Sequence, residues 1–187
     1  MTSRLSLFFI TLLLLLSIAL RNPILFLLGA LMALVAGASA LWGRYCLAGV
    51  AYDRRFGSTR LVCGEETDVW VEIVNAKPLP LAWLKAEDEV PAELPLERVD
   101  LGPGSAPNRR LLTNLFSLRW YERVRRHYRL TAARRGAFDF GPVGLSSGDL
   151  FGFQNRHTKI ARQHTVLVYP KIVSPEGLGL RAARPGG

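Results

Sequence analysis

Hydrophobic positions fall into two regimes along this chain, continuous at the N-terminus and alternating after it. Residues 5–20 and 24–42 form two apolar runs, and Arg4 and Arg21 are the only ionisable side chains before Arg44. A helix that crosses a bilayer needs about 17–25 apolar residues. The second run is therefore long enough to cross a membrane, and the first lies near the lower limit.

The break between the runs, Arg21-Asn22-Pro23, is typical of a tight connection, because proline disfavours helix in the residue before it and suits a helix start. Lipid leaves backbone polar groups without water, which favours helices. The sequence thus predicts a transmembrane helical hairpin over residues 1–43. The alternative is a signal peptide built on Arg4 and the leucines of 12–16 and cleaved near 36–40, but a signal peptide has one apolar region rather than two.

Positive charge around the two runs predicts their orientation. One arginine precedes the first run, one lies between the runs, and four follow the second run, namely Arg44, Arg54, Arg55 and Arg60. Lys and Arg mark the cytoplasmic side of membrane segments. We therefore expect a two-pass protein of the plasma (inner) membrane, with its N-terminus and its soluble body in the cytoplasm.

The remaining chain carries strand signals. Val69, Val71 and Ile73 alternate with more polar positions in TDVWVEIVN, and LAWLKAEDEVP (81–91) predicts a second strand with Trp83 as a core anchor and a solvated acidic end at 87–89. Short strands, turn residues and prolines favour a mainly antiparallel, immunoglobulin-like (Ig-like) β-sandwich over residues 44–175.

Other segments of the body have weaker patterns. Residues 44–60 suggest a polar, basic bridge out of the bilayer, 91–110 a long connection, and 111–120 either a helix or a strand. In 123–132 Arg126 interrupts the apolar face, which indicates an edge strand or a bulge. The tail 176–187 is typical of a linker, which suggests a fragment of a larger protein.

The formal charge of +9, from 24 basic and 15 acidic residues, raises the question of an anionic partner. Alternation predicts one basic strand face, and its contact candidates are Arg119, Arg123, Arg125 and Arg129. With Trp120, Tyr121 and Tyr128 nearby, this row could bind nucleic acid through phosphates and stacking. No known nucleic-acid module accompanies it, so we favour contact with lipid headgroups or an acidic protein.

Metal and cofactor sites are not indicated by the sequence. Cys46 and Cys63 lack CxxC spacing and are predicted to be unpaired thiols. His127, His157 and His164 follow no ligand spacing. We expect no metal, no cofactor and no small-molecule substrate.

Two enzyme motifs nearly fit a glycine-rich stretch, RRGAFDFGPVGLSSGDLFGF (134–153). Residues 144–148 match the GxSxG nucleophile elbow around Ser146, but no strand-turn-helix pattern surrounds it. Residues 136–141 have phosphate-loop spacing, but Pro142 stands where lysine is required. We therefore predict a non-catalytic protein whose glycines mark bends, with a serine hydrolase using Ser146 as the alternative.

The same stretch, followed by VLVYPKIV, resembles the signature of the domain of unknown function 58 family. The residues that match this signature are Arg135, Gly136, Gly141, Pro142, Ser146, Asp149, Phe151, Gly152, Val168, Tyr169 and Pro170. Residues 78–91, 119–130 and the N-terminal apolar pair are also similar to it, so the resemblance spans nearly the whole chain.

The resemblance implies a bacterial membrane protein that works with another protein, since members are often encoded beside MoxR-type AAA+ ATPases. Members continue into a von Willebrand A-like domain, and nothing in these 187 residues corresponds to it. No catalytic residue is carried over by the resemblance. The sequence thus predicts a membrane-anchored scaffold or interaction protein rather than an enzyme.

Overall fold

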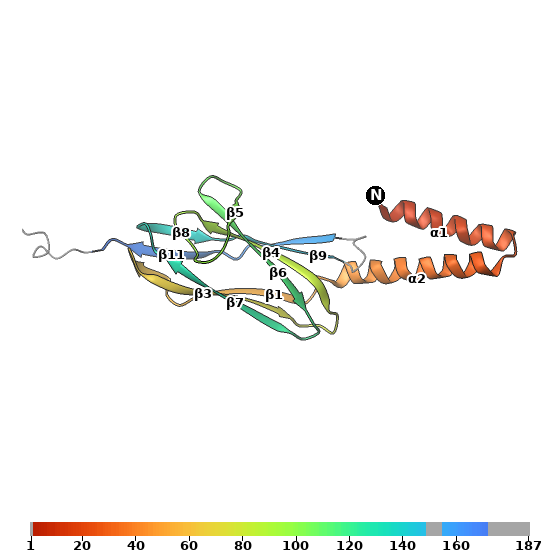
Figure 1. Ribbon diagram of the computed structural model, residues 1–187, viewed down its shortest axis with the longest axis horizontal. Helices are drawn as coiled ribbons and strands as arrows, with labels where there is room; N and C mark the ends of the chain where they lie inside the picture. The colour runs from red at the N-terminus through yellow and green to blue at the C-terminus, as the bar shows by residue number, and fades with distance from the viewer. Residues whose placement is uncertain (1, 149–154, 172–187) are drawn as a thin grey trace, which may run out of the picture.

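The computed structural model of the protein describes residues 2–148 and 155–171, and it begins with two antiparallel helices (Figure 1). These are α1 (Thr2–Ala19) and α2 (Pro23–Tyr45). The Asn22 side chain accepts hydrogen bonds from the backbone N–H groups of Ile24 (3.0 Å) and Leu25 (3.4 Å) and so caps α2, while Pro23 occupies the first turn. The predicted tight connection at 21–23 is confirmed.

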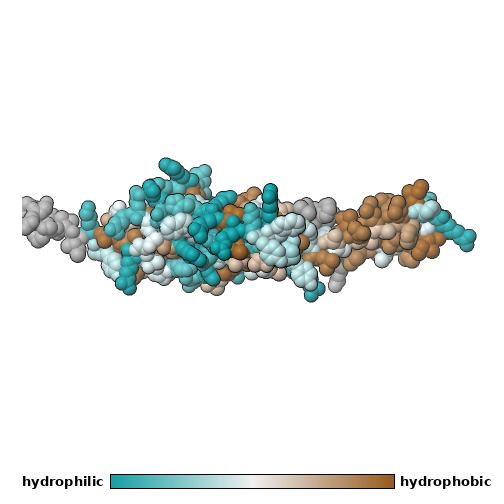
Figure 2. All heavy atoms as spheres, turned by 90° about the horizontal axis from the view of Figure 1, so that it is seen from below, coloured by the Kyte–Doolittle hydropathy of each residue, from teal (hydrophilic) through white to brown (hydrophobic). Residues whose placement is uncertain are grey.

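The surface of the helix pair is apolar over most of its length, in contrast to the polar body (Figure 2). At 1.5 Å per residue, the 23 residues of α2 extend about 34 Å, comparable to a bilayer core. In the described part of the chain, α2 alone is long and apolar enough to cross a membrane. The apolar part of α1, Leu5–Ala19, is shorter.

Within the described residues, the body is built from eleven strands in three sheets, mainly antiparallel as predicted. The strands are β1 (Val50–Phe56), β2 (Arg60–Val62), β3 (Glu66–Asn75), β4 (Leu81–Pro91), β5 (Gly102–Pro103), β6 (Arg109–Leu118), β7 (Arg123–Thr131), β8 (Gly136–Phe140), β9 (Val143–Gly148), β10 (Asn155–Ile160) and β11 (His164–Tyr169). The sheet orders are β1-β3-β7, β10-β9-β4-β6-β5 and β2-β11-β8, in which β2 and β11 are parallel.

Two apolar clusters fill the space between the sheets. The proximal core, around Ile73, Leu84 and Val143, joins the β1-β3-β7 sheet to the five-stranded sheet, and Trp42 of α2 packs against it. The distal core, around Leu130 and Phe140, draws in the third sheet at the end of the body farther from the helices. The two cores together form a β-sandwich whose proximal end is attached to α2.

A buried ion pair joins the two layers between these cores. Arg54 of β1 contacts both carboxylate oxygens of Asp88 of β4 at 2.5 Å, and both side chains are 2% exposed. Tyr52 donates to the same carboxylate (2.7 Å), and burial raises the pKa of this phenol. The Arg54 guanidinium also lies 5.3 Å from the ring centroid of Phe140. This pair corrects two predictions: residues 44–60 contain a core strand rather than only a basic bridge, and Asp88 is not solvated.

The placed strands correct one further prediction, decide a second that was open and confirm a third. A register shift between Leu81 and Leu84 turns Trp83 out of the core, and Leu84 packs there instead. Residues 109–118 form strand β6 rather than a helix. Arg126 does lie on an edge strand, where its guanidinium stacks over Phe116 (4.5 Å to the centroid) and donates to Asn114 Oδ1 (2.7 Å).

The junction between α2 and the body is closed by Lys77. Its ammonium group donates to the carbonyl oxygens of Cys46 and Ala48 (2.6 Å for the latter), so it caps the carboxyl end of the helix from the β3–β4 turn. Cys46 is fully buried in the proximal core. These contacts fix the direction in which the helix leaves the body.

We expect Asp88→Asn to lower the free energy of unfolding by about 3–5 kcal/mol, because it leaves the Arg54 charge buried without its counterion. Glu87→Gln is the matched control, since Glu87 forms a partly exposed pair with Lys85 and should cost less than about 1 kcal/mol. Denaturant unfolding of the full chain in detergent measures both. Equal losses in the two variants would contradict a structural role for the buried pair.

Candidate functional site

The outer face of the β1-β3-β7 sheet carries a two-row array of charges. β3 supplies Glu66, Asp68 and Glu72, and β7 supplies Arg123, Arg125, His127 and Arg129 opposite them. Antiparallel pairing sets Glu72 directly against Arg125 and Asp68 against Arg129. Opposite charges on neighbouring strands attract, so the strand register itself arranges this array.

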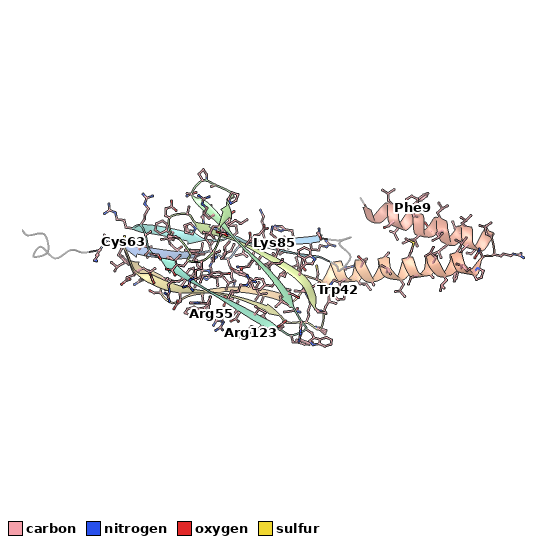
Figure 3. All side chains as sticks on the ribbon, in the orientation of Figure 1. Phe9, Trp42, Arg55, Cys63, Lys85 and Arg123 are labelled. Carbon is pink, nitrogen blue, oxygen red and sulfur yellow. The ribbon has the colours of Figure 1, made fainter. Side chains whose placement is uncertain are left out.

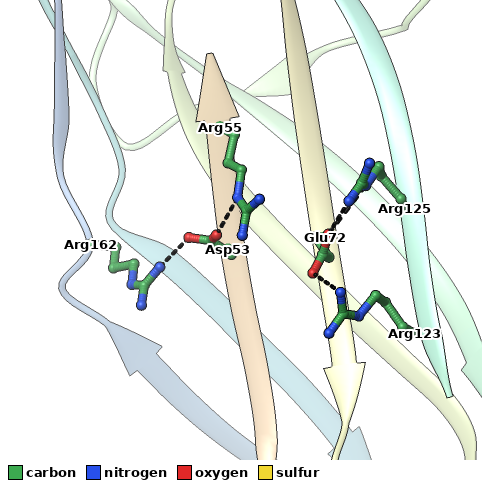
Figure 4. Close-up of polar contacts among 6 residues, drawn as sticks. All are labelled: Asp53, Arg55, Glu72, Arg123, Arg125 and Arg162. Carbon is green, nitrogen blue, oxygen red and sulfur yellow. Dashed lines mark hydrogen bonds and ion pairs between the residues drawn. The ribbon is translucent and has the colours of Figure 1, made fainter. Parts of the chain in front are cut away.

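Glu72 is the centre of the array, because two arginines hold its carboxylate (Figure 4). Arg125 donates to Oε2 from Nη2 (2.8 Å) and Nε (3.1 Å), and Arg123 approaches Oε1 at 3.4 Å. The Glu72 side chain is only 6% exposed, whereas the two arginines are more than half exposed. The hydrogen bond from Arg125 is the largest of the contributions that lower the pKa of Glu72, which stays ionised at neutral pH.

Asp53 of β1 forms a second arginine–carboxylate unit on this face. It accepts from Arg55 (3.0 Å) and pairs with Arg162, which lies before β11 (Figure 4). Although burial raises the pKa of Asp53, the hydrogen bond from Arg55 and the charge of Arg162 lower it overall. Four guanidinium groups thus surround these two carboxylates. With Arg129, Glu66 and Asp68 of the same face included, five arginines stand against four carboxylates, a net charge of +1 (five minus four).

The structure separates the four predicted contact arginines. Arg123, Arg125 and Arg129 lie on one outer face, as alternation predicts, but Arg129 is only loosely paired with Glu66 at 3.8 Å. Arg119 lies instead on the β6–β7 turn. A strand rises about 3.3 Å per residue, so Arg129 is about 20 Å farther along β7 than Arg123. A flat lipid surface at the proximal end therefore cannot meet all four arginines.

Sequence reasoning missed the acidic half of this face. The sequence does not single out the carboxylates Asp53 and Glu72, nor Arg162, which pairs with Asp53. The reason is that the pairing of β3 with β1 and β7 joins residues far apart in the chain. The alternation in VAYDRRF and TDVWVEIVN does place Asp53, Arg55 and Glu72 on outward positions, and that pattern is the signal that could have identified them.

The GxSxG segment lies in strand β9 rather than at a nucleophile elbow. Ser146 pairs across the sheet with His157 of β10, and its hydroxyl lies 2.8 Å from His157 Nδ1. A Cβ at Gly144 would come within 3.0 Å of the His157 ring, so glycine leaves room for this ring. The serine and the first glycine of the motif are thus both explained by a cross-strand histidine. Asp149 lies outside the described residues.

The other residues that match the signature of the domain of unknown function 58 family have local structural roles where they are described. Gly141 has φ +97°, and a Cβ there would come within 2.2 Å of the Arg162 carbonyl oxygen, so glycine is required. Pro142 follows through a cis peptide bond, and Gly136 also has positive φ. Tyr169 ends β11 beside Pro170, and Arg135 is exposed before β8. Phe151 and Gly152 lie outside the described residues.

Among residues 2–148 and 155–171, no group of three or more His, Cys, Asp or Glu side chains could hold a metal ion. A pocket of about 330 Å³ lies beside the distal part of β7, lined by Glu97, Arg98, Val99, His127, Tyr128 and Arg129. Its lining shares His127 and Arg129 with the array.

Comparisons with known proteins do not identify a family. No family model and no curated protein matches the chain. The solved structures similar to it include the CARDB domain of a Pyrococcus furiosus protein (8% identity, TM-score 0.41, covering 65% of this chain and 94% of that domain). They also include a cohesin module of a Clostridium perfringens family 33 glycoside hydrolase (10%, 0.40, 65% and 99%). At such low TM-scores these similarities indicate neither a family nor a function.

His164 should make the fold sensitive to acid. Its Nδ1 lies 3.4 Å from Arg54 Nη2, and burial, followed by the Arg54 charge, lowers its pKa below the ordinary 6.5. The unfolded chain therefore binds this proton more readily, so stability present above about pH 6.5 is lost as the pH falls. We expect a shallower loss between about pH 7 and about pH 5 in His164→Gln than in the wild type. His157→Gln is the matched control, and equal slopes in wild type and His164→Gln would contradict this account.

Ser146→Ala tests whether the serine–histidine contact is chemical or structural. We expect the wild type to resist labelling by a fluorophosphonate probe, and the variant to lose about 0.5–1.5 kcal/mol of stability with its hydrogen bond. Ser147→Ala is the control, because Ser147 is fully buried and donates to the Trp83 carbonyl (2.7 Å). Labelling of the wild type that disappears only in Ser146→Ala would identify a hydrolase.

Proposed function

We propose that this protein is a membrane-anchored scaffold that presents an arginine-rich sheet face to an acidic protein partner, and that it is not an enzyme. The observation that carries the proposal is the outward array of Arg123, Arg125 and Arg129, whose side chains are more than half exposed although Glu72 holds the first two in place. Arginines positioned in this way can offer further N–H donors to carboxylates of a partner.

Membrane anchoring is supported by the helix pair. Its large apolar side chains are exposed along both helices, for example Phe9, Leu15, Leu27 and Leu34. The capped junction at Lys77 holds the body against the end of α2. We propose that α1 and α2 form a two-pass hairpin, with the N-terminus and the Ig-like body on the cytoplasmic side of the plasma membrane.

The class of partner comes from the family resemblance. A protein of the domain of unknown function 58 family would be expected to work with a MoxR-type AAA+ ATPase. The partner surface that suits the array is acidic, because the exposed arginines can donate to carboxylates beyond the one that Glu72 supplies. The outward face of the sheet is thus the proposed docking surface, with contact centred between Arg125 and Arg129.

Two alternatives are tied to particular observations. The Ser146–His157 contact of 2.8 Å favours a serine hydrolase, although Nδ1 rather than Nε2 faces the serine. The basic row with exposed Trp120 and Tyr121 favours nucleic-acid binding. The scaffold is preferred because Ser146 lies within strand β9 rather than at a nucleophile elbow, and because no known nucleic-acid module accompanies the basic row.

The double variant Arg125→Gln/Arg129→Gln should weaken binding of a purified MoxR-type AAA+ ATPase from the same genome by about tenfold or more, because interfacial charge pairs cost about 2 kcal/mol or more when one partner is lost. The full chain in nanodiscs is titrated with the ATPase at low and at physiological salt. The matched control is Arg156→Gln/Lys159→Gln, which removes the same charge from exposed β10.

Glu72→Gln gives the converse test, since it releases Arg123 and Arg125 from their internal carboxylate and should tighten the same complex. If Arg125→Gln/Arg129→Gln and Arg156→Gln/Lys159→Gln weakened binding of the ATPase equally, the effect would come from overall charge. The proposed docking face would then be wrong. Competition by a fluorescent single-stranded oligonucleotide at physiological salt would favour the nucleic-acid alternative instead.

A further inference from the structure

The turn between β6 and β7 lies beside the base of α2. The Tyr121 backbone N–H donates to the Lys77 carbonyl (3.2 Å), and the Lys77 side chain in turn caps the carboxyl end of α2. In Figure 1 this turn lies at the same end of the body as the junction with α2, and Trp42 marks that junction in Figure 3. The turn is therefore held at the level where the helix leaves the body.

The backbone of this turn is fixed, although its side chains point outward. Fully buried Asn75 donates from Nδ2 to the Arg119 carbonyl (2.8 Å) and from its backbone N–H to the Glu122 carbonyl (2.8 Å). Glu122 accepts from the Arg119 backbone N–H (2.5 Å). Tyr121 adopts φ +51°, which is costly for a residue with a bulky side chain. These hydrogen bonds and the strained φ hold the turn in one conformation, so its side chains point in one direction.

Trp120 and Tyr121 are 67% and 70% exposed on this turn. Within the described residues of the body, the other exposed large hydrophobic side chains are Leu115 and Tyr169, so adjacent exposed aromatic rings occur at one place. Neither ring contributes to the proximal or the distal core. Packing within the body therefore does not explain them.

An apolar surface lies between α2 and the β3–β4 turn, to which the β6–β7 turn is hydrogen-bonded at Lys77. A pocket of about 510 Å³ lies between the last turns of α2 and the β3–β4 turn, and it is lined by Leu41, Trp42, Tyr45, Lys77, Pro78 and Leu79 among others. Trp42 and Tyr45 on the helix, with Trp120 and Tyr121 on the body, make a group of aromatic rings at one end of the sandwich. Trp and Tyr gather in this way at the boundary between lipid and water.

Basic side chains accompany the rings. Arg119 is exposed on the turn itself, Arg123 opens β7 just after it, and Arg44 lies in the last turn of α2. Such side chains attract the anionic headgroups of a cytoplasmic leaflet. The chemistry of this end, aromatic rings with flanking arginines, thus matches an anionic phospholipid surface better than an acidic protein.

We propose that Trp120 and Tyr121 insert into the headgroup region of the bilayer that α2 crosses, as a second membrane contact that fixes the tilt of the body. The inference rests on the proposed membrane anchoring. With two contacts, at the α2 base and at the β6–β7 turn, the body cannot swing about its helix. The charge array along β3 and β7 then faces sideways from the membrane, where a partner can reach it.

Tryptophan quenching in nanodiscs tests this contact with the full chain. The discs contain phosphatidylcholine and anionic phosphatidylglycerol, with or without bromine atoms high on the acyl chains. The emission of one tryptophan is obtained as the wild type minus its Trp→Phe variant. Trp120→Phe reports the turn, Trp42→Phe reports the base of α2, and Trp70→Phe is the control on the outer face of β3.

We expect brominated lipid to quench the Trp120 and Trp42 components and to leave the Trp70 component unchanged. Quenching of Trp42 alone would overturn the second contact while leaving the anchoring intact, and the exposed rings would then be free for a protein. If neither component is quenched, both the anchoring and the second contact fail. Loss of the quenching of Trp120 in Arg119→Gln/Arg123→Gln would confirm the headgroup contribution, since Arg119 lies on the turn and Arg123 directly follows it.

Discussion

The Arg54–Asp88 ion pair is the interaction on which the arrangement of this domain depends. It joins β1 to β4 and therefore one layer of the sandwich to the other, at the level where the proximal and distal cores meet. Phe140 and His164 close around the same guanidinium from the third sheet. A buried charge without its counterion is strongly destabilising. The three sheets must therefore keep the arrangement in which Asp88 meets Arg54.

That fixed core explains how the two ends of the body acquire different surfaces. β3 and β7 turn their apolar positions toward the cores, so their alternate positions place a charge array on the outside. At the proximal end, Lys77 and Asn75 lock the turns that surround α2. The rigid sandwich thus relates the helix, the aromatic turn and the arginine array to one another, which is the geometric property that a scaffold needs.

The architecture could largely be predicted from periodicity, but the polar interior could not. Alternation identified β3, β4, β7 and the outward arginines, because burial of one sheet face imposes a period of two. The run at 87–89 reads as a solvated acidic end, although Asp88 shares its alternating face with Leu84, Ala86 and Val90. Burial of Asp88 is possible because Arg54 faces it. That contact follows from the pairing of β1 with β3, opposite β4, which the sequence pattern does not show.

Local exceptions account for the other errors. A register shift in β4 buries both Leu81 and Leu84, so Trp83 takes the outward side set by Leu84 rather than the inward side set by Leu81. The contact of Ser146 with His157 depends on the pairing of β9 with β10, so the letters of GxSxG could neither predict nor exclude it. By contrast, the bend at residues 141–142 is recognisable from the sequence, because glycine and proline act on the backbone conformation at their own positions.

Protease protection of membrane vesicles from a bacterial host measures whether the body is anchored and cytoplasmic, as proposed. In inside-out vesicles we expect digestion of the body and retention in the membrane of a fragment containing the helix pair (2–45). In right-side-out vesicles the full chain should remain protected. Digestion in right-side-out vesicles, or release of the whole chain from the membrane by alkali, would overturn the proposed topology.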